Sequence, residues 1–162
     1  MEQITKEELL DVIGKFELGD NTEVVSVEPY GSGHINDTFR LEVKEDGQEK
    51  LYILQRMNKD IFKNQKELME NILQVTSFLT DKIKAQGGDP NRETLQVIPT
   101  KEGKSYLIEA NGDGWRVYPF ITDSLSFDKA DTPEAMKKSG YAFGNFQYLL
   151  SDFPAEKLHE TI

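Results

Sequence analysis

The first sixteen residues alternate apolar and charged side chains at the spacing of a helix. The apolar positions on one face are Leu9, Val12, Ile13 and Phe16. Thr5 precedes them as an N-cap, and Glu8, three residues later, completes a capping-box pattern. We therefore expect a short amphipathic helix that packs on a sheet.

Three segments with strand-like composition come next. They are "TEVVSVEPY" (22–30), "DTFRLEVKE" (37–45) and "EKLYILQRMN" (49–58), and the turn "EDGQ" joins the second to the third. Their β-branched and aromatic residues partly alternate with polar ones, which is typical of strands that bury one face. The pattern predicts three consecutive antiparallel strands.

Helical spacing returns between about residues 60 and 86. The apolar positions that recur there are Leu68, Ile72, Val75 and Leu79. Gly87, Gly88 and Pro90 then end the run. We expect one long helix at about 62–86 that covers one face of the sheet, with Met69 and Leu73 in the core beside Leu68 and Ile72.

The remaining chain contains three more candidate strands and a final helix. The strands are "TLQVIPT" (94–100), "KSYLIEA" (104–110) and "GWRVYPFI" (114–121), separated by turn sequences. Thr132 and Pro133 predict the start of the last helix. Its apolar stripe comprises Ala142, Phe143, Phe146, Leu149 and Leu150. The order of elements predicts an α+β fold, with one domain at 1–121 and a connecting segment with a linker helix at 122–162.

Composition narrows the classes of function. The chain has 162 residues with 19 basic and 29 acidic side chains, a net charge of −10, which argues against a nucleic-acid partner. It contains no cysteine, and its two histidines, His34 and His159, are too few for a zinc cluster. No apolar run reaches the ~20 residues that cross a membrane, and the amino terminus lacks a secretion-signal pattern. We expect a cytoplasmic protein with no membrane partner.

The stretch "YGSGHINDTF" (30–39) places two glycines, a histidine and an asparagine between the first two strands. Glycines at a hairpin tip let backbone N–H groups approach an anion closely, and such a hairpin can cover a polyphosphate. The same composition also serves a plain turn that binds nothing. The residues of this stretch alone leave both interpretations open.

Five phrases in order add a family resemblance. The phrases "YGSGHINDTF", "YILQRMN", "LMENI", "VIPTKEGKSY" and "WRVYPFI" resemble the aminoglycoside phosphotransferase/choline kinase-like family of the protein-kinase-like fold. Within that family they are most similar to the N-acetylhexosamine 1-kinases. The resemblance implies an amino-terminal kinase lobe, in which an antiparallel sheet and one covering helix bind ATP, followed by a linker helix.

The resemblance also implies roles for individual residues. Gly31, Ser32, Gly33 and Asn36 match the loop that covers the ATP phosphates. His34, beside these glycines in the matched loop, is expected to hydrogen-bond either a hydroxyl of the amino sugar substrate or the γ-phosphate.

Such kinases carry a lysine on the third strand that contacts the phosphates, whereas this chain has Gln55 followed by Arg56. Neighbouring strand residues face opposite ways, so only one of the two faces the nucleotide unless the strand is bulged. Alignment favours Gln55 at the lysine position, while charge favours Arg56, which is equally expected to be solvated or structural.

Two further parts of the ATP site follow from the resemblance. Glu70 matches the acid on the long helix that pairs with the third-strand residue, with Glu67 as a competitor and surface charge as the alternative for both. The adenine ring is expected against Tyr118, Phe120 and Ile121. Pro119 has no N–H, so Phe120 or Ile121 must donate to the ring. Tyr118 is equally expected to be an ordinary core aromatic.

The catalytic motif of the family is missing from these 162 residues. Phosphoryl transfer on this fold needs an H-G-D-x-x-x-x-N loop and a second aspartate for Mg²⁺, and neither histidine is followed by that pattern. We therefore expect a fragment that is inactive alone, with the Mg²⁺ ligands in a missing carboxy-terminal lobe. Its final helix should expose Phe143, Phe146 or Leu150, which allows self-association. The alternatives are another aminoglycoside or choline kinase-like phosphotransferase and a noncatalytic α+β binding module.

Overall fold

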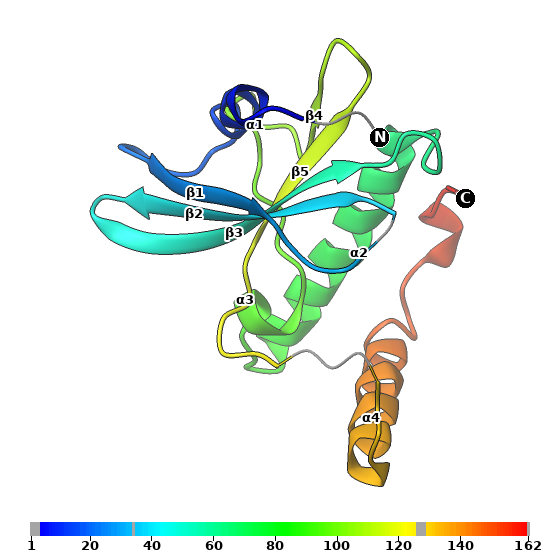
Figure 1. The fold of residues 1–162 in the computed structure, drawn as a ribbon. Coiled ribbons are helices and arrows are strands. Elements are labelled where there is room, and N and C mark those ends of the chain that lie inside the picture. The colour runs from blue at the N-terminus through cyan, green and yellow to red at the C-terminus, as the bar shows by residue number, and fades with distance from the viewer. Residues whose placement is uncertain (1–3, 34, 126–128, 162) are drawn as a thin grey trace.

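The structure is a computed structural model that describes residues 4–33, 35–125 and 129–161. The described residues form an α+β fold with a five-stranded antiparallel sheet in the order β1-β2-β3-β5-β4. Helices lie on both faces of this sheet (Figure 1). The elements are α1 (Lys6–Ile13), β1 (Glu23–Pro29), β2 (Asp37–Glu45), β3 (Gln48–Met57), α2 (Gln65–Ala85), α3 (Pro90–Glu93), β4 (Leu107–Ile108), β5 (Gly114–Pro119), α4 (Pro133–Leu149) and a 3-10 turn (Ala155–Lys157).

The local signals of the amino-terminal half are confirmed. The Glu8 N–H donates to Thr5 Oγ1 at 3.3 Å, and the Thr5 N–H donates to Glu8 Oε2 at 2.8 Å, so the capping box forms at α1. Asp46 and Gly47 both take positive φ, at 49° and 81°, as a two-residue hairpin turn requires. This turn fixes the pairing of β2 with β3 along the full length of β2.

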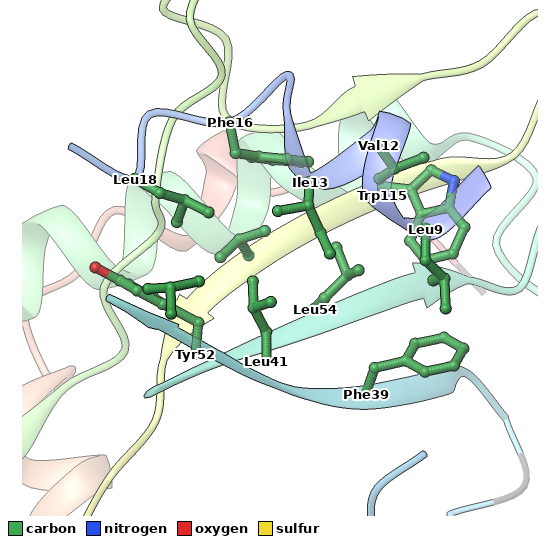
Figure 2. Packing of buried hydrophobic residues seen from close by; sticks show 12 residues of the cluster. Leu9, Val12, Ile13, Phe16, Leu18, Phe39, Leu41, Tyr52, Leu54 and Trp115 are labelled. Atoms are coloured by element: carbon green, nitrogen blue, oxygen red, sulfur yellow. The ribbon is translucent and has the colours of Figure 1, made fainter. Parts of the chain in front are cut away.

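The largest buried apolar cluster lies between the sheet and α1, on the face that we call the α1 face. Figure 2 shows its side chains converging from β2, β3, β5, α1 and the segment after α1. Its buried members are Leu9, Val12, Ile13, Phe16, Leu18, Phe39, Leu41, Val43, Tyr52, Leu54, Trp115 and Val117. Alternation along the strands turns every second side chain to this face. The first helix therefore packs on the sheet as its pattern predicts.

Helix α2 lies across the opposite face of the sheet, which we call the α2 face (Figure 1). It begins at Gln65 and not near residue 62, because the Asn64 side chain accepts the Glu67 N–H and caps the helix there. Met69 is fully buried, as expected. Leu73 is 38% exposed, so its placement in the core was wrong.

The second half of the sheet has fewer strands than the pattern predicts. Residues 94–100 make only the isolated bridges Ile98–Val117 and Phe16–Thr100, and β4 has two residues. Pro99 has no N–H to extend a ladder along this segment. The expected strand at 94–100 is therefore corrected to an extended segment beside β5, and the short helix α3, capped by Asp89, was not predicted.

Helix α4 starts where the sequence predicts, because Thr132 Oγ1 accepts the Ala135 N–H at 3.1 Å. Leu149 is buried against Leu79 and Ile83 of α2. Phe143 and Phe146 are 70% and 46% exposed. Among the described residues, no helix combines the length and apolarity needed to cross a bilayer.

Candidate functional site

The hairpin of residues 30–36 leaves its glycine backbone open to a ligand. The Tyr30 N–H donates to the Thr38 carbonyl at 2.8 Å and closes the hairpin. Gly31 has a φ of +81°, and a Cβ placed on Gly31 or Gly33 would meet no atom within 4 Å. Ser32 is exposed, and a hollow of about 530 Å³ beside the hairpin is lined by Gly31 and Gly33 together with Phe39 and Arg56 of the α1 face. The predicted substrate residue His34 lies outside the described residues.

Asn36 anchors the base of this hairpin. Its Oδ1 accepts the Asn58 N–H, just beyond β3, at 2.9 Å. The oxygen of Asn36 is therefore engaged in holding the hairpin over the end of β3. This contact supports a positioning role for Asn36, beside its predicted place in a phosphate-covering loop.

The strand register aligns three polar residues on the α2 face. Thr38 of β2 lies opposite Gln55 of β3, which lies opposite Arg116 of β5. Gln55 Nε2 donates to Thr38 Oγ1 at 2.9 Å. Gln55 Oε1 accepts from Arg116 Nε at 3.0 Å and from Arg116 Nη2 at 2.6 Å. We call Thr38, Gln55 and Arg116 the polar row.

Arg56 points to the opposite face and is part of the packing there. It is 6% exposed, and its guanidinium lies 2.5 Å from Asp37 Oδ2, 3.3 Å from Asp113 Oδ2 and 5.8 Å from the Trp115 ring centroid. Burial works against the charge of Asp113, yet Lys59 and Arg56 together leave the pKa of its carboxyl below the ordinary value. Of the two candidates on β3, Gln55 faces α2, whereas Arg56 faces the α1 side, where it is buried, paired with Asp37 and Asp113, and lines the hollow beside the hairpin.

Arg116 was not among the predicted site residues. Its Nη1 lies 3.8 Å from Met69 Sδ, and its guanidinium lies 5.3 Å from the Tyr118 ring centroid. Within the described part of the chain, no carboxylate oxygen lies within 4.0 Å of its nitrogens. Burial lowers the pKa of Arg116 from its ordinary value and raises the pKa of Tyr118 to about 12. A charged residue alternating with aromatic ones in "WRVYPF" was the sequence signal for this site.

Glu70 does not pair with Gln55. Its carboxylate lies 2.9 Å from His159 Nε2 and 3.6 Å from Lys66 Nζ. Asn71 exchanges two hydrogen bonds of 2.8 Å with the His159 backbone, which brings the carboxy-terminal segment against α2. In the described structure, the competitor Glu67 makes no hydrogen bond to Gln55 either. From α2, Met69 reaches the polar row, with its Sδ 3.8 Å from Arg116 Nη1.

The segment after β5 offers free backbone groups and aromatic surface. The Phe120 N–H donates to the Leu51 carbonyl at 2.9 Å, whereas the Ile121 N–H makes no hydrogen bond within the described residues. The Phe120 ring meets the Tyr30 ring edge-on with centroids 5.4 Å apart. Tyr118 is 8% exposed and Ile121 is 46% exposed. Of the two predicted donors, only Ile121 remains available to a ligand.

Over residues 4–33, 35–125 and 129–161, no three His, Asp or Glu side chains gather closely enough to hold a metal ion. The described residues therefore do not themselves fit an Mg²⁺ site. No protein-family model matches the sequence.

Proposed function

We propose that this chain is the ATP-binding lobe of a small-molecule kinase that phosphorylates the anomeric hydroxyl of an N-acetylhexosamine. The family assignment rests on the resemblance of the five sequence phrases. The observation that carries the ATP-binding part is the polar row, which joins the glycine hairpin to β5 on the α2 face. Thr38 at the base of the hairpin, Gln55 of β3 and Arg116 of β5 lie on this one face, which supports the proposal.

The adenine ring would lie against the segment after β5. Val117 accepts the Ile98 N–H at 2.9 Å, at the edge of β5 away from β3. Residues two positions apart in a strand direct their backbone groups to the same edge. The carbonyl of Pro119, two residues after Val117, therefore faces that edge. In extended backbone, the N–H of Ile121 faces it too. One carbonyl and one N–H at this spacing suit the edge of an adenine ring. Phe120 and Tyr30 would supply apolar surface beside it.

The phosphates would lie under the glycine hairpin. Gly31 and Gly33 leave room for close approach, and backbone N–H groups are the usual donors of such a loop. Ser32 and His34 are their neighbours in the sequence. Catalysis of this class depends on positioning and on charge stabilisation, and the aspartates that complete it would come from a carboxy-terminal lobe.

Calorimetric titration of the 162-residue chain with ADP tests the ATP-binding part. The proposal expects saturable binding with one nucleotide per chain, and no transfer of phosphate from ATP to N-acetylglucosamine. Absence of binding would favour the noncatalytic α+β module. Sugar phosphate formed by the chain alone would contradict the proposal that the catalytic aspartates come from another lobe.

Product analysis tests the sugar. A protein that joins this chain to its catalytic lobe is given ATP with N-acetylglucosamine, N-acetylgalactosamine, choline or an aminoglycoside. Hexosamine 1-phosphate is the expected product. Preference for choline or the aminoglycoside would move the protein to another branch of the family and leave the ATP site intact.

A further inference from the structure

Strand β3 places no cation over the α2 face at the position where the resemblance implies a lysine. Gln55 occupies that position and is neutral. Arg56 turns to the α1 face, where Asp37 and Asp113 compensate its charge. A nucleotide bound under the hairpin therefore needs a positive charge from another element.

Arg116 of β5 has the geometry to supply that charge. Its Nε and Nη2 both donate to Gln55 Oε1, which draws the guanidinium from β5 over β3. Adjacent strands lie about 4.8 Å apart, so this position is one strand away from Thr38 at the base of the hairpin. Gln55 also bonds Thr38, so the amide holds the guanidinium and the hairpin strand in one arrangement.

The charge of Arg116 is uncompensated within the described residues. Its remaining contacts are the Met69 sulfur, a weak acceptor, and the Tyr118 ring. Arg116 is half-buried, which lowers its pKa, and removing part of a cation from water without a carboxylate beside it is unfavourable. Such a desolvated charge attracts an anion more strongly than an exposed one does. The guanidinium still has N–H groups that can donate to phosphate oxygens.

We propose that Arg116 binds the α- or β-phosphate of the nucleotide, and that Gln55 is the residue that positions it. This inference rests on the proposed function and assigns the phosphate-binding cation to β5 in place of β3. The planar guanidinium can satisfy Gln55 with one edge and a phosphate with its other N–H groups, which a lysine at the same position would not do.

Titration of Arg116→Gln with ADP and with adenosine tests this assignment in the absence of metal. ADP should bind about tenfold or more weakly than it does to wild type, which is the loss of a charged hydrogen bond. Adenosine should bind with unchanged affinity, because it carries no phosphate. Lys44→Gln is the matched control, since it removes one positive charge from the same face at the exposed far end of β2.

The outcomes separate the two proposals. If wild type binds neither ligand, the proposed function fails. If wild type binds ADP and Arg116→Gln binds it equally well, only the role of Arg116 fails. An equal loss for ADP and adenosine would also overturn that role, because it indicates a structural effect.

A measurement on wild type keeps the inference testable if Arg116→Gln does not fold. The nitrogen resonance of Arg116 Nε is followed by NMR during titration with ADP, adenosine and inorganic phosphate. A shift with ADP that adenosine does not produce supports the assignment. No shift with saturating ADP overturns it, and an equal shift with inorganic phosphate alone would identify a free-anion site in place of a nucleotide site.

Discussion

Replacing Gly33 by alanine should change the affinity for ADP without lowering the free energy of unfolding. A Cβ at Gly33 meets no atom within 4 Å, and Gly33 does not have a left-handed φ. Alanine should therefore leave the free energy of unfolding unchanged or raise it by about 0.4–1 kcal/mol, because it restricts the unfolded chain. Gly31 is the matched comparison: its φ is +81°, so Gly31→Ala should lower that free energy by about 1–2 kcal/mol.

Although the fold should tolerate Gly33→Ala, this variant should bind ADP more weakly than wild type does. If its backbone lies against a phosphate, the added methyl group crowds the ligand at a cost of about 1–3 kcal/mol, or about five- to 150-fold in affinity. Urea unfolding measures the stability of both variants, and calorimetry with ADP measures affinity. The reasoning is refuted if Gly33→Ala loses more than about 1 kcal/mol of stability, or if it binds ADP as wild type does.

The remaining predictions concern packing, charge and association. Asp113→Asn should lower the free energy of unfolding by about 1.5–3 kcal/mol at pH 7, measured by urea unfolding. Because the pKa of Asp113 is lowered in the folded state, this difference in the free energy of unfolding is present above the ordinary pKa of aspartate. It should shrink as the pH falls below about 4, and a difference that stays constant with pH would contradict the prediction. In the same assay, Met69→Ala should lower the free energy of unfolding by about 2–5 kcal/mol, and Leu73→Ala, at a partly exposed position, by less than about 1 kcal/mol. Equal losses would contradict the side of α2 that faces the sheet in this structure. Phe143→Ser should shift the chain toward monomer in sedimentation velocity, and unchanged association would exclude the exposed face of α4 as the contact.

Local sequence signals predicted the elements whose causes are local. Strand β2 and the turn at Asp46 and Gly47 follow from alternation and from turn chemistry, and the caps at Thr5 and Thr132 follow from side chains within three residues. The segment 94–100 was overpredicted, because its apolar composition says nothing about which edge of β5 is available.

The candidate site depends on contacts between distant residues. Alternation required Gln55 and Arg56 to face opposite ways, but the side of each is fixed by partners elsewhere in the chain, such as Asp113. Arg116 belongs to the candidate site because it donates to Gln55, which is 61 positions away in the sequence. Glu70 was assigned to the strand residue from the family resemblance, whereas the partner that it meets, His159, is far along the chain. No local pattern contains these pairings.

The central claim is that a nucleotide binds on the α2 face beneath the glycine hairpin. Titration of the isotope-labelled chain with ADP, followed by amide resonances in NMR, tests it most directly. The account predicts shifts at Gly31, Gly33, Gln55 and Ile121, with amides of the α1 face, such as Val12, unchanged. Shifts confined to the α1 face, or no shifts at saturating ADP, would contradict it.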